Sequence, residues 1–359
     1  MTIPFRPGGL PAWIGSLPVK DHDEALRLMF EYTPDGPIWV QLPYYRAEGM
    51  VAQFAPGMPG LKITDERIFV DDAAEDFDEQ QLRFFEEYMA VTEGGQAIDD
   101  SRFTLSESEA PGFYKFMQAL NENLDGSDPS PAAVKGQVTG PFTFGTGLVD
   151  AEGRAVFYNE QLRDAAVKLI AQKARWQVSQ LKKYGVPVII FLDEPALAGY
   201  GSSAFISVSR EEIEACFAEV IDAIHQEGGL AGVHVCANAE WSIILESAAD
   251  VVSFDAYSYF DKFMLYPDQI KQFMGKGGIL AWGIVPTGPA EVIETETADS
   301  IFSLWQQEAA RLEGLGYDKD QIVAQSLITP SCGKGSLSVD QAVKVIGMNK
   351  AVSEKVRGY

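Results

Sequence analysis

Cysteine and histidine are scarce in this sequence, which contains three residues of each among its 359. Three scattered cysteines do not make a disulfide framework, and thiols stay reduced in a cytoplasm, so we expect a cytoplasmic protein. Long hydrophobic runs are also missing, because no stretch approaches the roughly 20 apolar residues that a membrane-spanning helix requires. Residues 1–15 lack the basic and then apolar segments of a signal peptide. These absences predict neither a secreted disulfide-rich protein nor a membrane protein.

Positively charged residues are outnumbered. The sequence has 28 Lys and Arg against 52 Asp and Glu, which gives a formal net charge of −24 and a pI near 4.4. A surface of this sign repels the phosphates of nucleic acids and of anionic lipids, so we expect neither nucleic acid nor a membrane as a partner. The acidic stretch at 71–81 is typical of a solvated loop that leads into a helix.

What the sequence does contain is a series of short apolar runs that are rich in Val and Ile. Most of them are bounded by Gly, Pro or Asp, which is typical of strands. Stretches with a helical pattern separate most of these runs. The predicted strands are 12–16, 37–42, 135–140, 187–194, 230–236, 250–256, 278–285 and 321–329.

The stretches between the runs predict amphipathic helices. One begins at Asp21, which is suited to an N-cap, and another ends at Gly185 after placing Leu162, Leu169 and Val178 on one stripe. Eight strands that alternate with helices predict an α/β fold of the (β/α)8 TIM barrel type, whose strands are buried on both faces. The predicted helical ranges are 21–33, 159–185, 209–229 and 338–356.

One segment interrupts this alternation. Residues 43–134 follow the second predicted strand and contain two helical patterns, at 78–91 and 112–124. We predict an inserted helical segment over one rim of the barrel, serving as a lid or an oligomer contact. Because no linker rich in Gly, Ser or Pro divides the chain, we predict that residues 1–359 form a single barrel domain with 43–134 as an insertion within it.

The active site of this fold lies at the carboxyl ends of its strands, and the residues at the ends of the predicted strands are mostly polar. In chain order these residues are Ile14, Gly15 and Ser16, then Gln41, Thr139, Asp193 and Glu194, and finally His234, Cys236, Asp255 and Cys332.

His234 and Cys236 are two positions apart in a strand, so their side chains point to the same side. Cys332 is expected at the same mouth three strands along the ring, and Asp255 follows the neighbouring strand. One imidazole, two sulfurs and a carboxylate suit tetrahedral zinc, and a labile oxygen ligand leaves one position for a substrate. A histidine and a cysteine so spaced are more often packed against each other; it is their convergence with Cys332 that predicts metal.

The remaining cysteine and histidines are not predicted as ligands. Cys216 and His225 fall within a predicted helix, and His22 falls at a helix start. Buried cysteine commonly behaves as a small hydrophobic residue, so we expect Cys216 in the core.

Five motifs carry a resemblance to a known family. "WIGSLP" (13–18), "FLDEPAL" (191–197), "HVC" (234–236), "VVSFDA" (251–256) and "TPSCG" (329–333) follow one another in this order. The sequence therefore resembles the C-terminal catalytic barrel of cobalamin-independent methionine synthase, from about residue 12 to the end. It is similar to the short, single-barrel relatives in the superfamily that also holds uroporphyrinogen decarboxylase and zinc-dependent corrinoid methyltransferases.

The resemblance implies roles for particular residues. His234, Cys236 and Cys332 match the zinc ligands of the family, and Asp255 stands where the methionine synthases have a glutamate ligand. The segment Ile14, Gly15 and Ser16 matches the part that holds an amino acid thiol. Asp193 matches the carboxylate that takes the substrate ammonium, which makes it the predicted catalytic residue, and its neighbour Glu194 is predicted to help in substrate binding. The implied activity is methyl transfer to a zinc-activated, homocysteine-like thiol, giving methionine.

Two departures from the family pattern bear on the chemistry. No carboxylate aligns with the family glutamate after strand two, and Glu48 is the nearest. No histidine follows strand seven, where the folate-dependent enzymes carry a proton donor. We therefore expect a methylated corrinoid as the methyl donor, and because the chain has no Asp-x-His-x-x-Gly motif, the corrinoid must come on a separate protein.

Three alternatives stay open at this point. The first is a folate-dependent methionine synthase. The second is a decarboxylase of the uroporphyrinogen type, which needs several arginines to bind the substrate carboxylates; the first 60 residues of the sequence offer Arg6, Arg27 and Arg46. The third is a non-catalytic barrel whose zinc is structural or absent. The sequence is also compatible with an oligomer.

Overall fold

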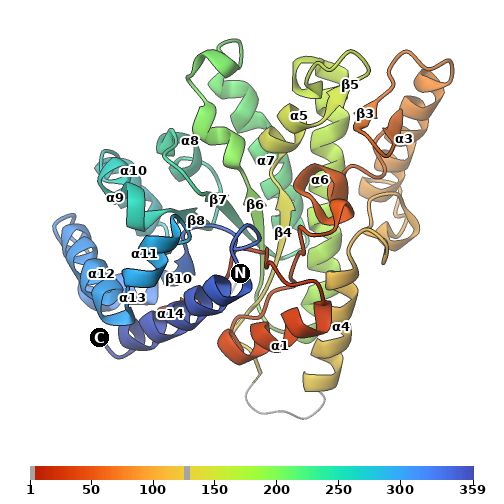
Figure 1. Cartoon of the computed structure of the whole chain (residues 1–359). Helices are drawn as coiled ribbons and strands as arrows, with labels where there is room; N and C mark the ends of the chain where they lie inside the picture. Colours follow the sequence, from red (N-terminus) through yellow and green to blue (C-terminus); the bar gives the residue numbers. More distant parts are fainter. Residues whose placement is uncertain (1–4, 125–129) are drawn as a thin grey trace.

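Seven parallel strands form the central sheet of the protein. The structure is a computed structural model that describes residues 5–124 and 130–359 (Figure 1). The strands lie in the order β1-β10-β9-β8-β7-β6-β4. From β4 to β10, each strand therefore lies beside the strand of this sheet that precedes it along the chain. Their bounds are β1 Leu10–Pro11, β4 Val134–Thr139, β6 Val188–Asp193, β7 Leu230–Val235, β8 Val251–Phe254, β9 Ile279–Val285 and β10 Ser326–Pro330.

Residues 37–42 close this sheet into a ring. They form no regular strand, but one parallel bridge joins Ile38 to Lys135 of β4 and a second joins Gln41 to Ser16. The backbone N–H of Gln41 donates to the carbonyl of Gly15 at 2.9 Å. The eighth position of the barrel is therefore occupied, and the predicted (β/α)8 architecture is confirmed.

Some strand boundaries differ from the prediction. Residues 12–16 continue β1 without a regular ladder, and the predicted strand 321–329 begins only at Ser326. Lys319–Ala324 forms helix α13 instead, because Asp318 caps it by accepting from the backbone N–H of Gln321. A short apolar run does not by periodicity alone distinguish a buried strand from a helix, and here the local cap decides.

Alternate residues of β6 separate the apolar core into two clusters. Ile189 and Phe191 belong to a small cluster inside the barrel, whereas Val188, Ile190 and Leu192 pack outside against the helices. This follows from the pleat of a strand, which points successive side chains to opposite faces. The inner cluster is made of Leu10, Ala12, Ile14, Ala133, Ile189, Phe191, Val251, Ile279, Ala281 and Leu327.

Helices cover the outside of the ring, and many begin at a side-chain cap. Asp21, Asn159 and Ser209 accept from backbone N–H groups at the starts of α1, α6 and α7, as N-caps do. The helices of the ring are α1 His22–Tyr32, α5 Pro141–Gly147, α6 Glu160–Leu181, α7 Arg210–Gln226, α8 Trp241–Leu245, α9 Ala256–Phe263, α10 Pro267–Gly275, α11 Ala290–Thr295, α12 Ala298–Glu313, α13 Lys319–Ala324 and α14 Val339–Arg357. Among the described residues, no helix has the length and apolarity needed to cross a membrane.

The segment after residue 42 contains the two expected helices and more. Its helices are α2 Met50–Phe54, α3 Phe77–Thr92 and α4 Pro111–Leu124, and a 3₁₀ turn, η1, spans Arg46–Glu48. A small sheet in the order β2-β3-β5 was not predicted; its strands are Leu61–Ile63, Ile68–Val70 and Val149–Asp150. Figure 1 shows α3 and β3 at the upper right, on the side of the barrel where α6 lies. Residues 125–129 of the predicted insertion lie outside the described residues.

Candidate functional site

A pocket of about 380 Å³ opens at the carboxyl ends of the barrel strands. It brings together residues that are far apart in the sequence, among them seven of the predicted site residues, which lie at or beyond the ends of the four strands β1, β6, β7 and β10. No lysine or arginine lines it within the described residues. Its lining residues are Ile14, Gly15, Ser16, Gln41, Pro43, Glu48, Gly49, Met50, Asp193, Pro195, His234, Cys236, Cys332, Gly333, Gly335 and Ser336.

His234, Cys236 and Cys332 converge in this pocket. One imidazole nitrogen of His234 and the two Sγ atoms of Cys236 and Cys332 all lie within 4.8 Å of one another. His234 and Cys236 come from the end of β7, and Cys332 follows β10. The three side chains thus meet across the mouth as their spacing in the sequence predicts.

The imidazole of His234 is buried and presents one free nitrogen. Its Nδ1 lies 2.9 Å from the hydroxyl oxygen of Ser253 on β8, whereas its Nε2 has no hydrogen-bond partner. A buried polar atom without a partner costs free energy unless a ligand or water satisfies it. One imidazole nitrogen and two thiol sulfurs are a donor set that zinc accepts, so the residues present fit this metal.

The two thiols influence each other's acidity. A hydrogen bond with Cys332 lowers the pKa of Cys236 from its ordinary value. The same hydrogen bond, together with burial, raises the pKa of Cys332, while the neighbouring His234 acts in the opposite direction. One sulfur of the pair therefore bears negative charge more readily than the other, as expected of two acidic groups that share a proton.

Asp255 lies outside this cluster of three. It is the N-cap of α9, where its Oδ1 accepts from the backbone N–H of Ser258 at 2.8 Å. Burial raises the pKa of Asp255, while the hydrogen bonds from Ser258 and the nearby His234 act in the opposite direction. Its predicted ligation of the metal stays a prediction.

Asp193 and Glu194 are neighbours in sequence with opposite orientations. Asp193 faces the pocket, and its Oδ1 is buried without a hydrogen-bond partner. Burial raises the pKa of Asp193, and His234 and Lys135 counteract this by their charge.

Glu194 does not line the pocket. Its Oε1 accepts from the backbone N–H of Phe142 at 2.9 Å, and its Oε2 accepts from the backbone N–H of Thr143 at 2.8 Å and from the Thr143 hydroxyl at 2.6 Å. A carboxylate at this place caps the start of α5 and stabilises that helix end. Both carboxylate oxygens of Glu194 are therefore bonded to α5, and neither is free to bind a substrate in the pocket as predicted.

Ile14, Gly15 and Ser16 line the opposite side of the pocket. A Cβ atom on Gly15 would lie 2.6 Å from Oε1 of Gln41 and 3.0 Å from Cδ of Gln137, so a larger residue would require these glutamine side chains to shift. Close packing of this kind holds the backbone of the segment at a fixed distance from the cavity.

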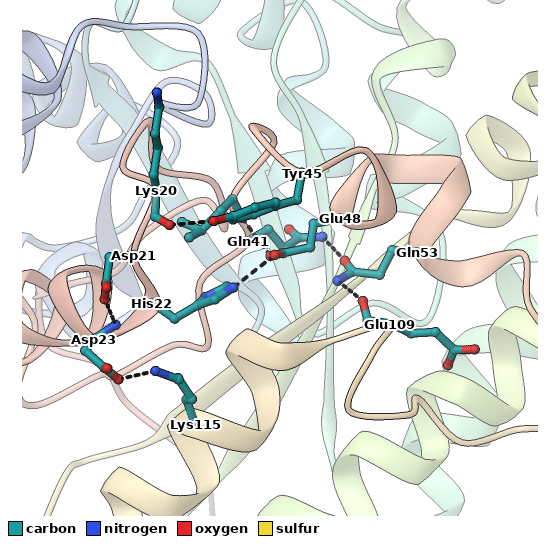
Figure 2. Close-up of polar contacts among 11 residues, drawn as sticks. Lys20, Asp21, His22, Asp23, Gln41, Tyr45, Glu48, Gln53, Glu109 and Lys115 are labelled. Carbon is teal, nitrogen blue, oxygen red and sulfur yellow. Dashed lines mark hydrogen bonds and ion pairs between the residues drawn. The ribbon is translucent and has the colours of Figure 1, made fainter. Parts of the chain in front are cut away.

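Glu48 is a buried carboxylate in the pocket wall that the sequence indicated only as the nearest acidic residue. Figure 2 shows its contact with His22, whose Nε2 lies 2.9 Å from Oε1 of Glu48. Its Oε2 accepts from the backbone N–H of Leu42 at 2.8 Å. Beside it, Gln41 donates to Gln53, which donates to the carbonyl of Glu109 (Figure 2). The imidazole of His22 is therefore a partner of the Glu48 carboxylate.

A second group of acidic side chains lies elsewhere. Asp72, Asp150 and Glu152 also place potential ligand oxygens within 4.8 Å of one another. Arg154 already forms ion pairs with Asp150 and Glu152, so a cationic group of the protein occupies this cluster.

Comparisons with known proteins found similarity among solved structures. No protein-family model and no curated protein matches the chain. Among solved structures, the chain is similar to a B12-independent methionine synthase from Shewanella sp. W3-18-1 in complex with selenomethionine, with 17% identity, a TM-score of 0.49, and coverage of 68% of this chain and 67% of that chain. A Cellulomonas fimi endo-β-1,4-mannanase double mutant gives 12% identity and a TM-score of 0.36, with coverage of 74% and 61%.

The first of these proteins is named as a methionine synthase. The second has a quite different name and shares an overall likeness alone. Likeness at this level carries no conclusion about activity, which has to be argued from the site itself.

Proposed function

We propose that the protein is a zinc-dependent methyltransferase that moves a methyl group to the thiol of a homocysteine-like amino acid, giving methionine. The observation that carries this proposal is the convergence of His234, Cys236 and Cys332 at the mouth of the barrel, with Nε2 of His234 unpartnered. These three residues would hold the metal, and the pocket beside them leaves room for an incoming sulfur compound.

Zinc, when bound, supplies the Lewis acidity that keeps a coordinated thiol deprotonated at neutral pH, where a free thiol with a pKa near 8.5 is mostly protonated. The residues of the chain orient the substrate. A thiolate lone pair forms the new S–CH₃ bond, and the carrier leaves with the electron pair of the bond that breaks.

Asp193 is the residue proposed to orient an amino acid thiol. Its carboxylate faces a pocket without cationic side chains, and its Oδ1 has no partner. A substrate ammonium would satisfy that oxygen and compensate its charge, fixing the distance from the amino group to the sulfur. Ile14, Gly15 and Ser16 line the same pocket and would contact the remainder of the amino acid.

The proposed donor is a methylated corrinoid carried by a separate protein. Methylfolate leaves as a strongly basic nitrogen anion unless an acid protonates it, whereas a methyl–cobalt bond breaks with its electron pair left on cobalt and needs no proton. No histidine follows β9, and His234 is the one imidazole that lines the pocket among the described residues.

A methyl-transfer assay decides between the donors. The zinc-loaded protein is supplied with homocysteine and either methylcobalamin or methyltetrahydrofolate, and methionine is measured. We expect turnover with methylcobalamin. Turnover with methylfolate alone would overturn the corrinoid donor and favour the folate-dependent alternative.

The alternative of a uroporphyrinogen-type decarboxylase has less support. Such an enzyme needs arginines against the substrate carboxylates. Arg27 is exposed on α1 and pairs with Glu31, and Arg46 donates to the carbonyls of Thr64 and Asp65 on the surface. Neither lines the pocket.

Metal analysis of the wild type against Cys332→Ser tests the metal itself. The wild type should retain close to one zinc per chain, and the variant should lose it together with thiol methylation while keeping its fold. Loss of the fold with the metal would favour a structural zinc, because such sites supply folding energy. A wild type without zinc affinity would overturn the proposal.

A further inference from the structure

The seam between strands β1 and β10 has few ladder hydrogen bonds. Strands β1 and β10 pair only through Leu10 with Leu327 and Pro11 with Ile328, and the last regular bond of this seam runs from the Ala12 N–H to the Ile328 carbonyl at 2.9 Å. Above it, toward the mouth, the substrate segment Ile14–Ser16 and the loop that carries Cys332 have no ladder between them.

Lys334 joins the two segments instead. Its side chain is fully buried, and its Nζ donates to the carbonyl of Ile14 at 3.0 Å. Its backbone N–H donates to the carbonyl of Ser16 at 3.1 Å. The next N–H, of Gly335, donates to the hydroxyl oxygen of Ser16 at 3.2 Å. The side-chain nitrogen of Lys334 thus takes the place of a ladder hydrogen bond.

The loop lies too close to Ser16 for other side chains. A Cβ atom on Gly333 would lie 2.3 Å from the Ser16 hydroxyl oxygen, and one on Gly335 would lie 2.7 Å from Cγ of Pro43 and 3.2 Å from Cβ of Ser16. Glycine on both sides of Lys334 is therefore what allows this approach. The residue that binds Ile14 is separated from Cys332 by a single position.

We propose that Lys334 is a positioning residue that couples the metal cluster to the amino acid subsite, so that a thiol bearing an amino acid backbone is preferred to a simple thiol. The inference rests on the proposed function and extends it to selectivity for the acceptor. Because the distance between Cys332 and Ile14–Ser16 is fixed, one ligand can contact the metal and this segment at the same time without a rearrangement of the protein.

The test uses the cobalt-substituted protein, in which thiolate binding gives a charge-transfer absorption band. Homocysteine and propane-1-thiol are titrated into the wild type, Lys334→Met and Lys173→Met. Lys173 is the matched control because it is also fully buried, but its Nζ has no hydrogen-bond partner and it lies on α6, outside the pocket lining.

For Lys334→Met we expect unchanged affinity for cobalt and for propane-1-thiol, and a preference for homocysteine that falls roughly 10- to 100-fold. Lys173→Met should keep the wild-type preference. An unchanged preference in Lys334→Met overturns the inference. An equal loss of cobalt, propane-1-thiol and homocysteine binding overturns it too, because Lys334 would then serve the metal site alone.

A second variant and a second readout keep the test decisive. If Lys334→Met does not fold, Ser16→Ala removes the hydroxyl that Gly335 contacts and should reduce the same preference to a smaller extent. Hydrogen–deuterium exchange of residues 12–17 is followed with and without cobalt; cobalt should protect them in the wild type and not in the Lys334 variant. A wild type that shows this protection but no thiolate band refutes the proposed function while supporting the coupling, and equal protection in both proteins overturns the coupling.

Discussion

His234 of β7 and Ser253 of β8 are direct neighbours across two parallel strands, and the imidazole Nδ1 lies 2.9 Å from the serine hydroxyl oxygen. This contact directs Nε2 toward the two cysteines. Ser253 is fully buried, so water does not replace it readily. The hydroxyl therefore fixes the orientation of the imidazole ring of the proposed ligand.

We predict that Ser253→Ala weakens metal binding roughly 10- to 100-fold, because the ring loses the partner that orients it. Chelator competition measures the affinity, and the cobalt absorption spectrum should also change. Ser253→Thr, which restores a hydroxyl, should recover most of the affinity. Ser326→Ala is the control, since Ser326 is buried on β10 and bonds Trp282 instead. Equal affinities in all four proteins would contradict the prediction.

Asp193→Asn should separate amino acid thiols from simple thiols. Removing the carboxylate charge should cost about 1.5–3 kcal/mol of substrate binding, the range for hydrogen bonds to charged groups, and raise the KM for homocysteine accordingly. Propane-1-thiol has no ammonium group, so its binding should not change. The two thiols are compared by titration of the cobalt protein and by steady-state kinetics. A loss shared by both thiols would show that Asp193 serves the metal rather than the ammonium.

Removal of the metal should abolish activity without unfolding the protein. Neither apolar cluster includes His234, Cys236 or Cys332, so the core does not depend on the metal. Circular dichroism of the chelated protein should match that of the loaded one. Mass action alone predicts that the loaded protein gains about 2.7 kcal/mol of stability at a free metal concentration of 100 times Kd. Unfolding on chelation would refute this.

Glu308 on α12 should make stability depend on pH. It is buried, its Oε2 has no partner, and burial raises its pKa from 4.5 to about 9, with Asp261 and Asp255 adding to the shift and Arg311 opposing it. The folded state thus holds the proton more tightly than the unfolded state. Wild-type stability therefore falls as the pH rises from about 4.5 toward 9, by roughly 1.4 kcal/mol per unit where the group titrates only in the unfolded chain.

Glu308→Gln removes this dependence. The variant should match the wild type near pH 4.5 and exceed it at pH 8 by a few kcal/mol. Urea unfolding at both pH values measures the difference, and Glu313→Gln, at an exposed position of the same helix, is the control. A stability difference that is the same at pH 4.5 and pH 8 would rule out Glu308 as the cause.

The inner strands of the barrel were predictable because each is a continuous apolar run between breaking residues. The strands β6, β7 and β9 fall within a residue or two of the predicted ranges. The seam was not predictable to the same degree. Residues 12–16 and 37–42 are held by isolated bridges that exist only once the ring closes, and no local pattern reports such closure.

Some residues of the candidate site were likewise predictable from the sequence, and others were not. Alternation along a strand and the rule of carboxyl ends brought His234, Cys236 and Cys332 together correctly in space. An aspartate between a strand and a helix is equally suited to ligation and to capping, so the cap formed by Asp255 was not predictable. Glu194 caps α5 because it points outward where Asp193 points inward. Lys334 and Ser253 gave no signal, since a lysine in a loop and a serine in a strand are ordinary.

The small apolar cluster inside the ring has an evolutionary consequence. It is much smaller than the outer cluster between strands and helices, which contains most of the buried hydrophobic side chains. The residues that stabilise the barrel are therefore mostly different from the residues that would carry out the reaction. A lineage can exchange inward residues near the opening, and with them the reaction, at little expense to folding.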